Sequence, residues 1–207
     1  INEFFKGSKK NQKIGIVTQG GTYTVVMRAL HRLGAADAYG NSDVEIYCMN
    51  LVYPLVQSEL MDFMTNKDSI LVVEEGNPNY IETQIAEIAH TNEIKCRIHG
   101  KDMLPMAGEY VSNVVREGIA QYLAEEGASD VSKLALDKNT EIVAKTKKAQ
   151  SFLESPMPPR PPSFCTGCPE RPIMAALKML MKERGKFHIS MDIGCNLFGS
   201  LPPFNVG

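Results

Sequence analysis

The sequence predicts an α/β protein, with a mostly parallel sheet flanked by helices, followed by a linker and a truncated second α/β domain. Short β-branched apolar runs alternate with amphipathic helical stretches as far as about residue 127. The segment 155–162 then contains five prolines in eight positions. A new helical pattern, preceded by a Cys-x-x-Cys motif, begins after residue 164. These observations divide the chain into a first domain (1–127), a linker (128–163) and a second domain (164–207).

The composition indicates a globular protein of a reducing compartment. The chain has 207 residues, of which 43% are hydrophobic and 22% charged, and its formal net charge is −2. This balance argues against nucleic acid or an anionic membrane as a partner. No apolar run approaches the roughly 20 residues of a transmembrane helix. Five cysteines at irregular spacing do not suggest a secreted disulfide framework, so we expect a cytoplasmic protein.

Predicted strands and helices alternate through the first domain. The run Lys13–Thr18 leads into apolar residues at helical spacing from Val25 to Leu33, and Gly34 favours a helix end. Strands separated by helices form right-handed crossovers and hence a mostly parallel sheet. The predicted strands are 13–18, 44–49, 69–73 and 94–98, and the predicted helices are 22–33, 54–64, 79–90 and 107–123.

The region after residue 127 differs in character. Residues 125–155 are polar and are expected to be partly helical. The proline-rich stretch 155–162 can neither pair nor coil, so it is predicted to be an extended, semi-rigid connector. The second domain is predicted to contain a helix at 170–183 and a strand at 187–193. One helix and one strand cannot bury a core, so we expect this domain to be incomplete.

Two features at predicted strand ends are candidates for ligand binding. Gly20-Gly21 lies between a strand and a helix, where backbone amides can hold an anion, but it lacks the full dinucleotide pattern and the P-loop lysine. A tight turn is the favoured interpretation there. Glu74 and Glu75 close the third predicted strand at the carboxyl edge, where open α/β sheets bind ligands. A solvated edge that caps neighbouring helices is favoured over a binding role.

The cysteines of the second domain carry the strongest local signal. Cys165 and Cys168 lie where a loop meets a helix, whose positive end lowers thiol pKa values, and Cys195 closes the next predicted strand. By spacing alone, an iron–sulfur cluster, a zinc site and inert thiols are equally supported. Cys48 and Cys96 lie in predicted strands and are expected to be buried apolar residues. The four histidines show no metal-binding spacing, and no GxSxG elbow is present.

Two stretches of the second domain carry a family resemblance. They are PPRPPSFCTGCPERPIMAALK (158–178) and SMDIGCNLFGSLPPFNVG (190–207). They resemble the thiamine diphosphate-binding domain of 2-oxoacid:ferredoxin oxidoreductases, and the similarity is greatest to the large (alpha) subunit of the indolepyruvate type. The first domain resembles the transketolase C-terminal-type domain of these enzymes through VTQGGTY (17–23) and ILVVEEGNPNYIETQI (70–85). The resemblance therefore spans nearly the whole chain.

The resemblance implies roles for particular residues. Cys165, Cys168 and Cys195 would be three ligands of a [4Fe-4S] cluster, with a fourth beyond Gly207. Gly194, Cys195 and Asn196 would lie close to the thiazolium ring of thiamine diphosphate. The GDG…N element that such enzymes use for Mg²⁺ and diphosphate is absent. We therefore expect residues 1–207 alone to hold neither cofactor and to be inactive.

The resemblance also implies a reaction and its partners. An aryl 2-oxoacid similar to indolepyruvate would be oxidatively decarboxylated to an acyl-coenzyme A, and ferredoxin would accept the electrons. The chain would assemble with a smaller beta subunit into a hetero-oligomer. Two alternatives remain open. The same family could act on pyruvate or a branched 2-oxoacid, or the chain could be a non-catalytic module with structural zinc or an unligated Cys-x-x-Cys pair.

Overall fold

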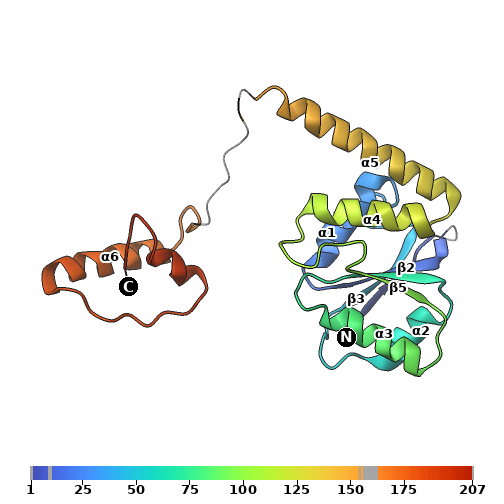
Figure 1. Ribbon diagram of the computed structural model, residues 1–207, viewed down its shortest axis with the longest axis horizontal. Helices are drawn as coiled ribbons and strands as arrows, with labels where there is room; N and C mark the ends of the chain where they lie inside the picture. Colours follow the sequence, from blue (N-terminus) through green and yellow to red (C-terminus); the bar gives the residue numbers. More distant parts are fainter. Residues whose placement is uncertain (1, 9–10, 154, 156–162, 207) are drawn as a thin grey trace. The chain divides into compact units, whose positions relative to one another are not determined.

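Five strands form one mixed sheet (Figure 1) in the computed structural model, which describes residues 2–8, 11–153, 155 and 163–206. The strands are β1 (Glu3–Phe5), β2 (Asn11–Gln19), β3 (Val44–Met49), β4 (Ser69–Val73) and β5 (Arg97–His99). Their order across the sheet is β1-β3-β2-β4-β5. β1 pairs antiparallel with β3, and all other neighbours are parallel. The predicted α/β fold with a mostly parallel sheet is confirmed.

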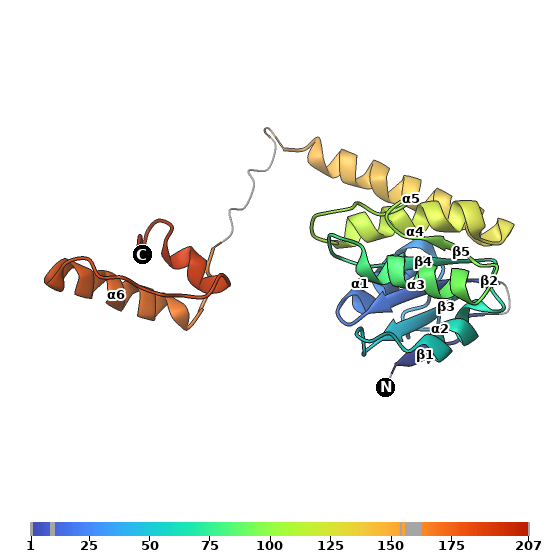
Figure 2. The same ribbon diagram turned by 60° about the horizontal axis from the view of Figure 1, so that its bottom comes forward.

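Helices cover both faces of this sheet. They are α1 (Thr22–Leu33), α2 (Gln57–Met64), α3 (Tyr80–Thr91), α4 (Ser112–Glu126) and α5 (Ser129–Gln150). Figure 1 and Figure 2 show α1, α4 and α5 on one face and α2 and α3 on the other. None of the helices in the described part of the chain is long and apolar enough to cross a membrane.

Alternate residues of the central strands pack into two separate cores, because successive side chains of a strand point to opposite faces. In β2, Ile16 packs with residues of α1 and α4, whereas Val17 packs with residues of α2 and α3. In β4, Leu71 belongs to the first core and Ile70 to the second. All of β4 is buried, which is why its sequence is an unbroken apolar run.

The first compact unit extends to Phe152, beyond the domain end expected near residue 127. The reason is the packing of α5 against α4 and α1. Val131 and Ala135 are buried in the core shared with those helices. Leu134 lies so close to Gly34 that any side chain at position 34 would collide with Leu134. The polar second half of α5 exposes most of its surface, so its sequence resembles a linker although the whole helix belongs to the unit.

The edges of the sheet differ most from the sequence prediction. The strand β1 was not predicted, because three residues are too few to show a pattern. It is held by its contacts with β3, and Phe4 stacks on Tyr47 with 4.7 Å between ring centroids. At the other edge, β5 begins at Arg97, later than the strand expected at 94–98, because pairing with β4 starts at this residue.

The second compact unit, Leu153–Gly207, contains α6 (Glu170–Arg184) and a short 3-10 helix, η1 (Cys195–Gly199). The predicted helix at 170–183 is confirmed. The strand predicted at 187–193 is wrong, because no segment among the described residues of this unit pairs with it. Most of the predicted proline-rich connector, 156–162, lies outside the described residues.

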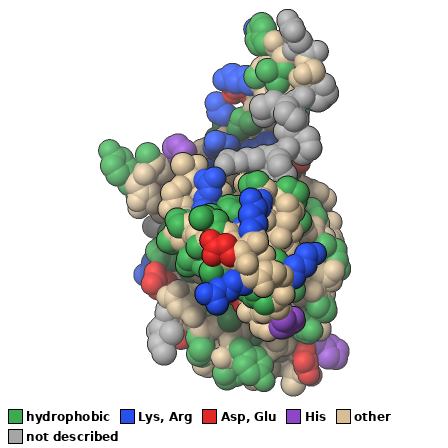
Figure 3. All heavy atoms as spheres, turned by 90° about the vertical axis from the view of Figure 1, so that its left-hand side faces the viewer, with side chains coloured by type: hydrophobic (Ala, Val, Ile, Leu, Met, Phe, Trp, Pro, Cys, Tyr) green, Lys and Arg blue, Asp and Glu red, His purple; other side chains and the backbone are tan. Residues whose placement is uncertain are grey.

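A small aromatic cluster holds the second unit together. Phe164 meets the rings of Phe198 and Phe204 edge to face, with centroids 5.7 and 5.6 Å apart. Met174 of α6 is buried against this part of the chain. Other hydrophobic side chains reach the surface, and on the face in Figure 3 they lie among Lys and Arg side chains. This unit therefore depends on few buried contacts.

Tyr122 provides a test of how α4 is joined to the sheet. Its buried hydroxyl lies 3.1 Å from the Gly15 carbonyl oxygen and 3.0 Å from the Ser69 carbonyl oxygen, so it links α4 to β2 and β4. Tyr122→Phe removes this buried partner, and we expect the free energy of unfolding to fall by about 1–3 kcal/mol. Urea denaturation measures the loss. Tyr39→Phe, at a side chain 92% exposed, is the control and should leave stability unchanged. Equal stability of the two variants would contradict this role.

Candidate functional site

The chain switches direction across the sheet at β2. β3 follows on one side of β2, and β4 then lies on its other side, so the connections diverge from neighbouring strand ends. In open α/β sheets, ligands bind in the crevice that such a switch point opens beyond the carboxyl ends of the strands. Here a crevice of about 530 Å³ lies at that place. Its walls come from the turn after β2, Glu75 in the loop after β4, and the loops 50–56 and 100–111.

Unequal loop lengths create the crevice. Only Gly20 and Gly21 separate β2 from α1, whereas the loops on either side are long. Gly20 has a φ of +43°, and there is open space beside both glycines. Thr22 closes the turn, since its Oγ1 accepts a hydrogen bond from the Gln19 amide at 3.1 Å and donates one to the Gln19 carbonyl at 2.6 Å. The structure thus shows the tight turn that the sequence favoured.

The two glutamates after β4 have separate roles. Glu74 is buried, and its carboxylate accepts hydrogen bonds from the amides of Ile81 and Glu82 at 3.0 and 3.1 Å, at the start of α3. It therefore caps a helix, as favoured from the sequence, but inside the protein and not at a solvated edge. Glu75 is exposed and lines the crevice, where it accepts a hydrogen bond from the Tyr110 amide at 2.7 Å.

Lys101 organises the loop on the far side of the crevice. Its Nζ donates hydrogen bonds to the Glu74 carbonyl oxygen at 2.5 Å and to the Tyr110 hydroxyl at 2.7 Å. The Tyr110 hydroxyl in turn donates to the Pro105 carbonyl at 2.6 Å. Loss of solvation lowers the pKa of Lys101, although neighbouring carboxylates oppose the shift. Burial raises the pKa of Tyr110 to about 12. The sequence offered no signal for Lys101, because its partners are distant in the chain or lie in irregular loops.

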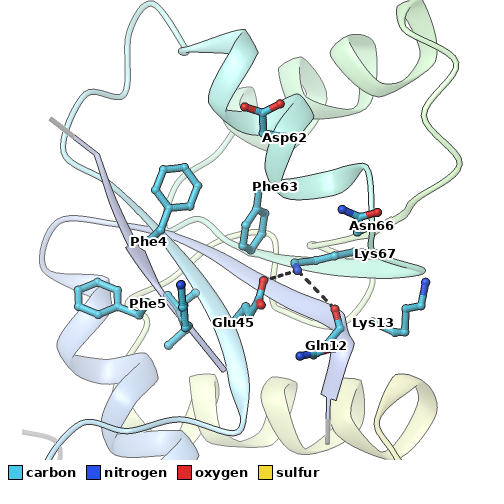
Figure 4. A pocket seen from close by; sticks show the side chains of 11 residues that line it. Phe4, Phe5, Gln12, Lys13, Glu45, Asp62, Phe63, Asn66 and Lys67 are labelled. Atoms are coloured by element: carbon cyan, nitrogen blue, oxygen red, sulfur yellow. Dashed lines mark hydrogen bonds and ion pairs between the residues drawn. The ribbon is translucent and has the colours of Figure 1, made fainter. Parts of the chain in front are cut away.

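A second hollow, of about 610 Å³, lies near the amino ends of β2 and β3 (Figure 4). Lys67 dominates it: its side chain is 4% exposed, and its Nζ lies 2.5 Å from a carboxylate oxygen of Glu45. The same ammonium sits 4.7 Å from the centre of the Phe63 ring. The positive charge of Lys67 is therefore balanced by the Glu45 carboxylate and the face of the Phe63 ring. Because this hollow lies away from the carboxyl edge and its buried charge is paired, we assign it a structural role.

The structure brings two of the three predicted cluster ligands together. Cys165 and Cys168 flank a turn in which the Cys168 amide donates to the Cys165 carbonyl at 3.1 Å. Gly167, with a φ of +76°, permits this turn. Cys165 is exposed and Cys168 half-buried, directly before α6. This pair of accessible thiols, one turn apart, suits a metal that binds thiolates.

Cys195 is not brought into a common metal group with that pair. It is exposed and begins η1, between Gly194 and Asn196. Asn196 donates a hydrogen bond to the Asp192 carboxylate at 2.7 Å. Among the described residues, no three His, Cys, Asp or Glu side chains are gathered to hold a metal ion. The donor chemistry of the cysteines thus fits a cluster, and the structure places two of the three candidate ligands on one turn.

The remaining cysteines have a different environment. Cys48 is buried in β3 as expected, and burial raises the pKa of its thiol. Cys96 precedes β5 and is half-buried, and loss of solvation raises its pKa to about 11. Thiols of this kind are poor nucleophiles and poor metal ligands, so the chemistry of the cysteines is confined to the second unit.

Replacing Lys101 tests whether it holds the crevice wall in place. Lys101→Met keeps the aliphatic stem but removes the hydrogen bonds to Glu74 and Tyr110. We expect amide hydrogen exchange across residues 101–111 to rise at least tenfold, because the loop loses its central donor. Mass spectrometry of exchanged peptides measures this. Lys95→Met, at an exposed lysine before β5, is the matched control. Unchanged exchange in Lys101→Met would show that other contacts order the loop.

Comparison with known proteins places the chain in a family. The sequence matches the indolepyruvate oxidoreductase domain over residues 5–150. It is 32% identical over 194 residues to the indolepyruvate oxidoreductase subunit IorA of Pyrococcus horikoshii and 30% identical over 195 residues to that of Thermococcus kodakarensis. Each alignment covers 94% of this chain and 27% of the relative, so the chain spans about a quarter of these proteins.

Among solved structures, a 2-oxoglutarate:ferredoxin oxidoreductase from Magnetococcus marinus is similar to 58% of this chain, which corresponds to 19% of that protein. The TM-score is 0.40 and the sequence identity 19%. The family match includes the sheet from β2 onward and all the helices packed on it. The chain therefore belongs to the indolepyruvate oxidoreductase domain family.

Proposed function

We propose that this chain is part of the large subunit of an oxidoreductase that oxidatively decarboxylates an aryl 2-oxoacid, similar to indolepyruvate, to an acyl-coenzyme A. Ferredoxin accepts the electrons, and the reaction takes place in the cytoplasm. The family match over residues 5–150 carries this proposal. Similarity to IorA proteins over 94% of the chain supports it, because the alignments extend beyond that domain toward the cysteine motif.

In this proposal the second unit contributes ligands to a [4Fe-4S] cluster. Cys165 and Cys168 supply two thiolates from the turn before α6, and Cys195 supplies a third. The exposure of Cys165 and Cys195 supports this role, since both thiols are accessible to a metal. A fourth ligand comes from outside residues 1–207. When bound, thiamine diphosphate with Mg²⁺ provides the carbanion chemistry, and a nearby cluster takes up electrons one at a time.

Gly194, Cys195 and Asn196 are proposed to lie beside the thiazolium ring of the bound thiamine. The hydrogen bond that the Leu197 amide donates to the Gly194 carbonyl at 3.1 Å supports an ordered backbone turn at this point. Burial raises the pKa values of both thiols of the first unit, Cys48 and Cys96, and we assign this unit a role in assembly with the smaller subunit of a hetero-oligomer. Residues 1–207 alone are expected to be inactive, because the diphosphate-binding element is absent from them.

Metal analysis of the full-length protein tests this proposal. We expect Cys165→Ser, prepared anaerobically, to lose roughly four irons and four acid-labile sulfides relative to the unaltered protein. Cys96→Ser is the matched control, since Cys96 lies in the first unit and its thiol is half-buried. It should retain all its iron. The difference in iron and sulfide content between each variant and the unaltered protein excludes iron that is held by any other clusters.

Two results would overturn the assignment. Unchanged iron in Cys165→Ser would remove the cluster from this motif. Loss of zinc in place of iron would identify Cys165 and Cys168 as ligands of a structural zinc site. The second result would favour a non-catalytic module, the alternative that the turn geometry of the Cys-x-x-Cys pair also permits.

A further inference from the structure

Exposed hydrophobic side chains are concentrated at the carboxyl edge of the first unit's sheet. Among its described residues, ten large hydrophobic side chains are exposed, and half of them lie on the loops at this edge or at the start of α3. The others are scattered over β1, α5, the turn after α5 and the amino-edge loop, 34–43, which leads into β3. The five at the carboxyl edge are Val52, Tyr53, Tyr80, Met106 and Val111. Val52 lines the crevice, and Tyr53, Met106 and Val111 lie on the same two loops, 50–56 and 100–111, that form its walls. A group of exposed apolar side chains at one edge is characteristic of a protein interaction site.

The crevice among these loops is acidic. Glu75 and Glu109 line it, and both side chains are exposed. Its described lining residues include neither Lys nor Arg, because Lys101 directs its ammonium to the Glu74 carbonyl and Tyr110. Two carboxylates repel an anionic ligand, although the amino end of α1, which carries partial positive charge, lies nearby. The charge instead favours a cationic group.

The walls of the crevice are held in place before any partner binds. The Lys101 ammonium fixes the loop 100–111 to the end of β4, and the Tyr110 amide is held by Glu75. Beneath the loop, Met103 and Leu104 are buried in the core. A preorganised surface loses little conformational freedom on binding, which favours affinity.

We propose that this carboxyl edge is the docking surface for the smaller subunit of the enzyme, and that a Lys or Arg side chain of that subunit enters the crevice beside Glu75 and Glu109. The inference rests on the proposed function, which supplies the second subunit. A basic side chain in an acidic crevice, surrounded by apolar contacts that exclude water, is the usual composition of a binding hot spot. The two carboxylates of the crevice favour a basic side chain, and the exposed apolar side chains at the same edge favour a protein partner.

Binding of the smaller subunit to the full-length protein, measured by calorimetry, tests the proposal. Glu109→Lys reverses one crevice charge, and Tyr53→Asp places a charge at a side chain that is 78% exposed. We expect each to weaken binding at least tenfold. Glu87→Lys on α3 and Tyr39→Asp on the amino-edge loop are the matched controls and should bind as the unaltered protein does.

Hydrogen exchange of the unaltered complex gives a second readout that needs no variant. We expect the smaller subunit to protect residues 50–56 and 100–111. The docking surface would be overturned if Glu109→Lys and Tyr53→Asp bound the smaller subunit as tightly as the unaltered protein and these loops were not protected. That result would leave the proposed function standing. Failure of the smaller subunit to bind the unaltered protein would overturn the hetero-oligomer in the proposed function, and the docking surface with it.

Discussion

The burial of Ile14–Thr18 in the central strand β2 is the constraint on which the first unit depends. Parallel neighbours flank this strand, and its side chains enter a separate core on each face, so helices must cover both faces. Gly15 lets Phe63 and Lys67 approach the middle of the strand, where a side chain would collide with both. On the opposite face, the Tyr122 hydroxyl bonds to the backbone of β2 and of its neighbour β4.

The same constraint places the crevice. A central strand with crossovers diverging from it opens a hollow at its carboxyl end, and the short glycine turn keeps that hollow free of backbone. The loops around it are ordered by Lys101 and Glu74, whose hydrogen bonds connect three successive elements at this edge. The first unit thus presents a shaped, acidic surface, and burial raises the pKa values of its two thiols. The second unit places Cys165 and Cys168 on a turn before a helix.

The sequence predicts well those features that depend on a few neighbouring residues, and poorly those that depend on contacts between distant parts of the chain. The bounds of α1, β3 and β4 follow from apolar patterns within a few residues, and they agree with the structure. The strand expected at 187–193 is absent because a strand needs a partner, which its own residues cannot reveal. Lys101 was missed because Glu74, its main partner, is 27 positions away. The Cys165–Cys168 turn was recognised from its spacing, whereas the position of Cys195 depends on how the whole second unit folds.

Ferredoxin reduction provides the most direct test of the proposed function. The full-length protein and its smaller subunit would be assayed anaerobically with thiamine diphosphate, Mg²⁺, coenzyme A and a series of aryl, aliphatic and branched 2-oxoacids. We expect ferredoxin to be reduced with aryl 2-oxoacids, and only when both the 2-oxoacid and coenzyme A are present. Absence of reduction with every 2-oxoacid, in a preparation that retains its iron and sulfide, would contradict the account.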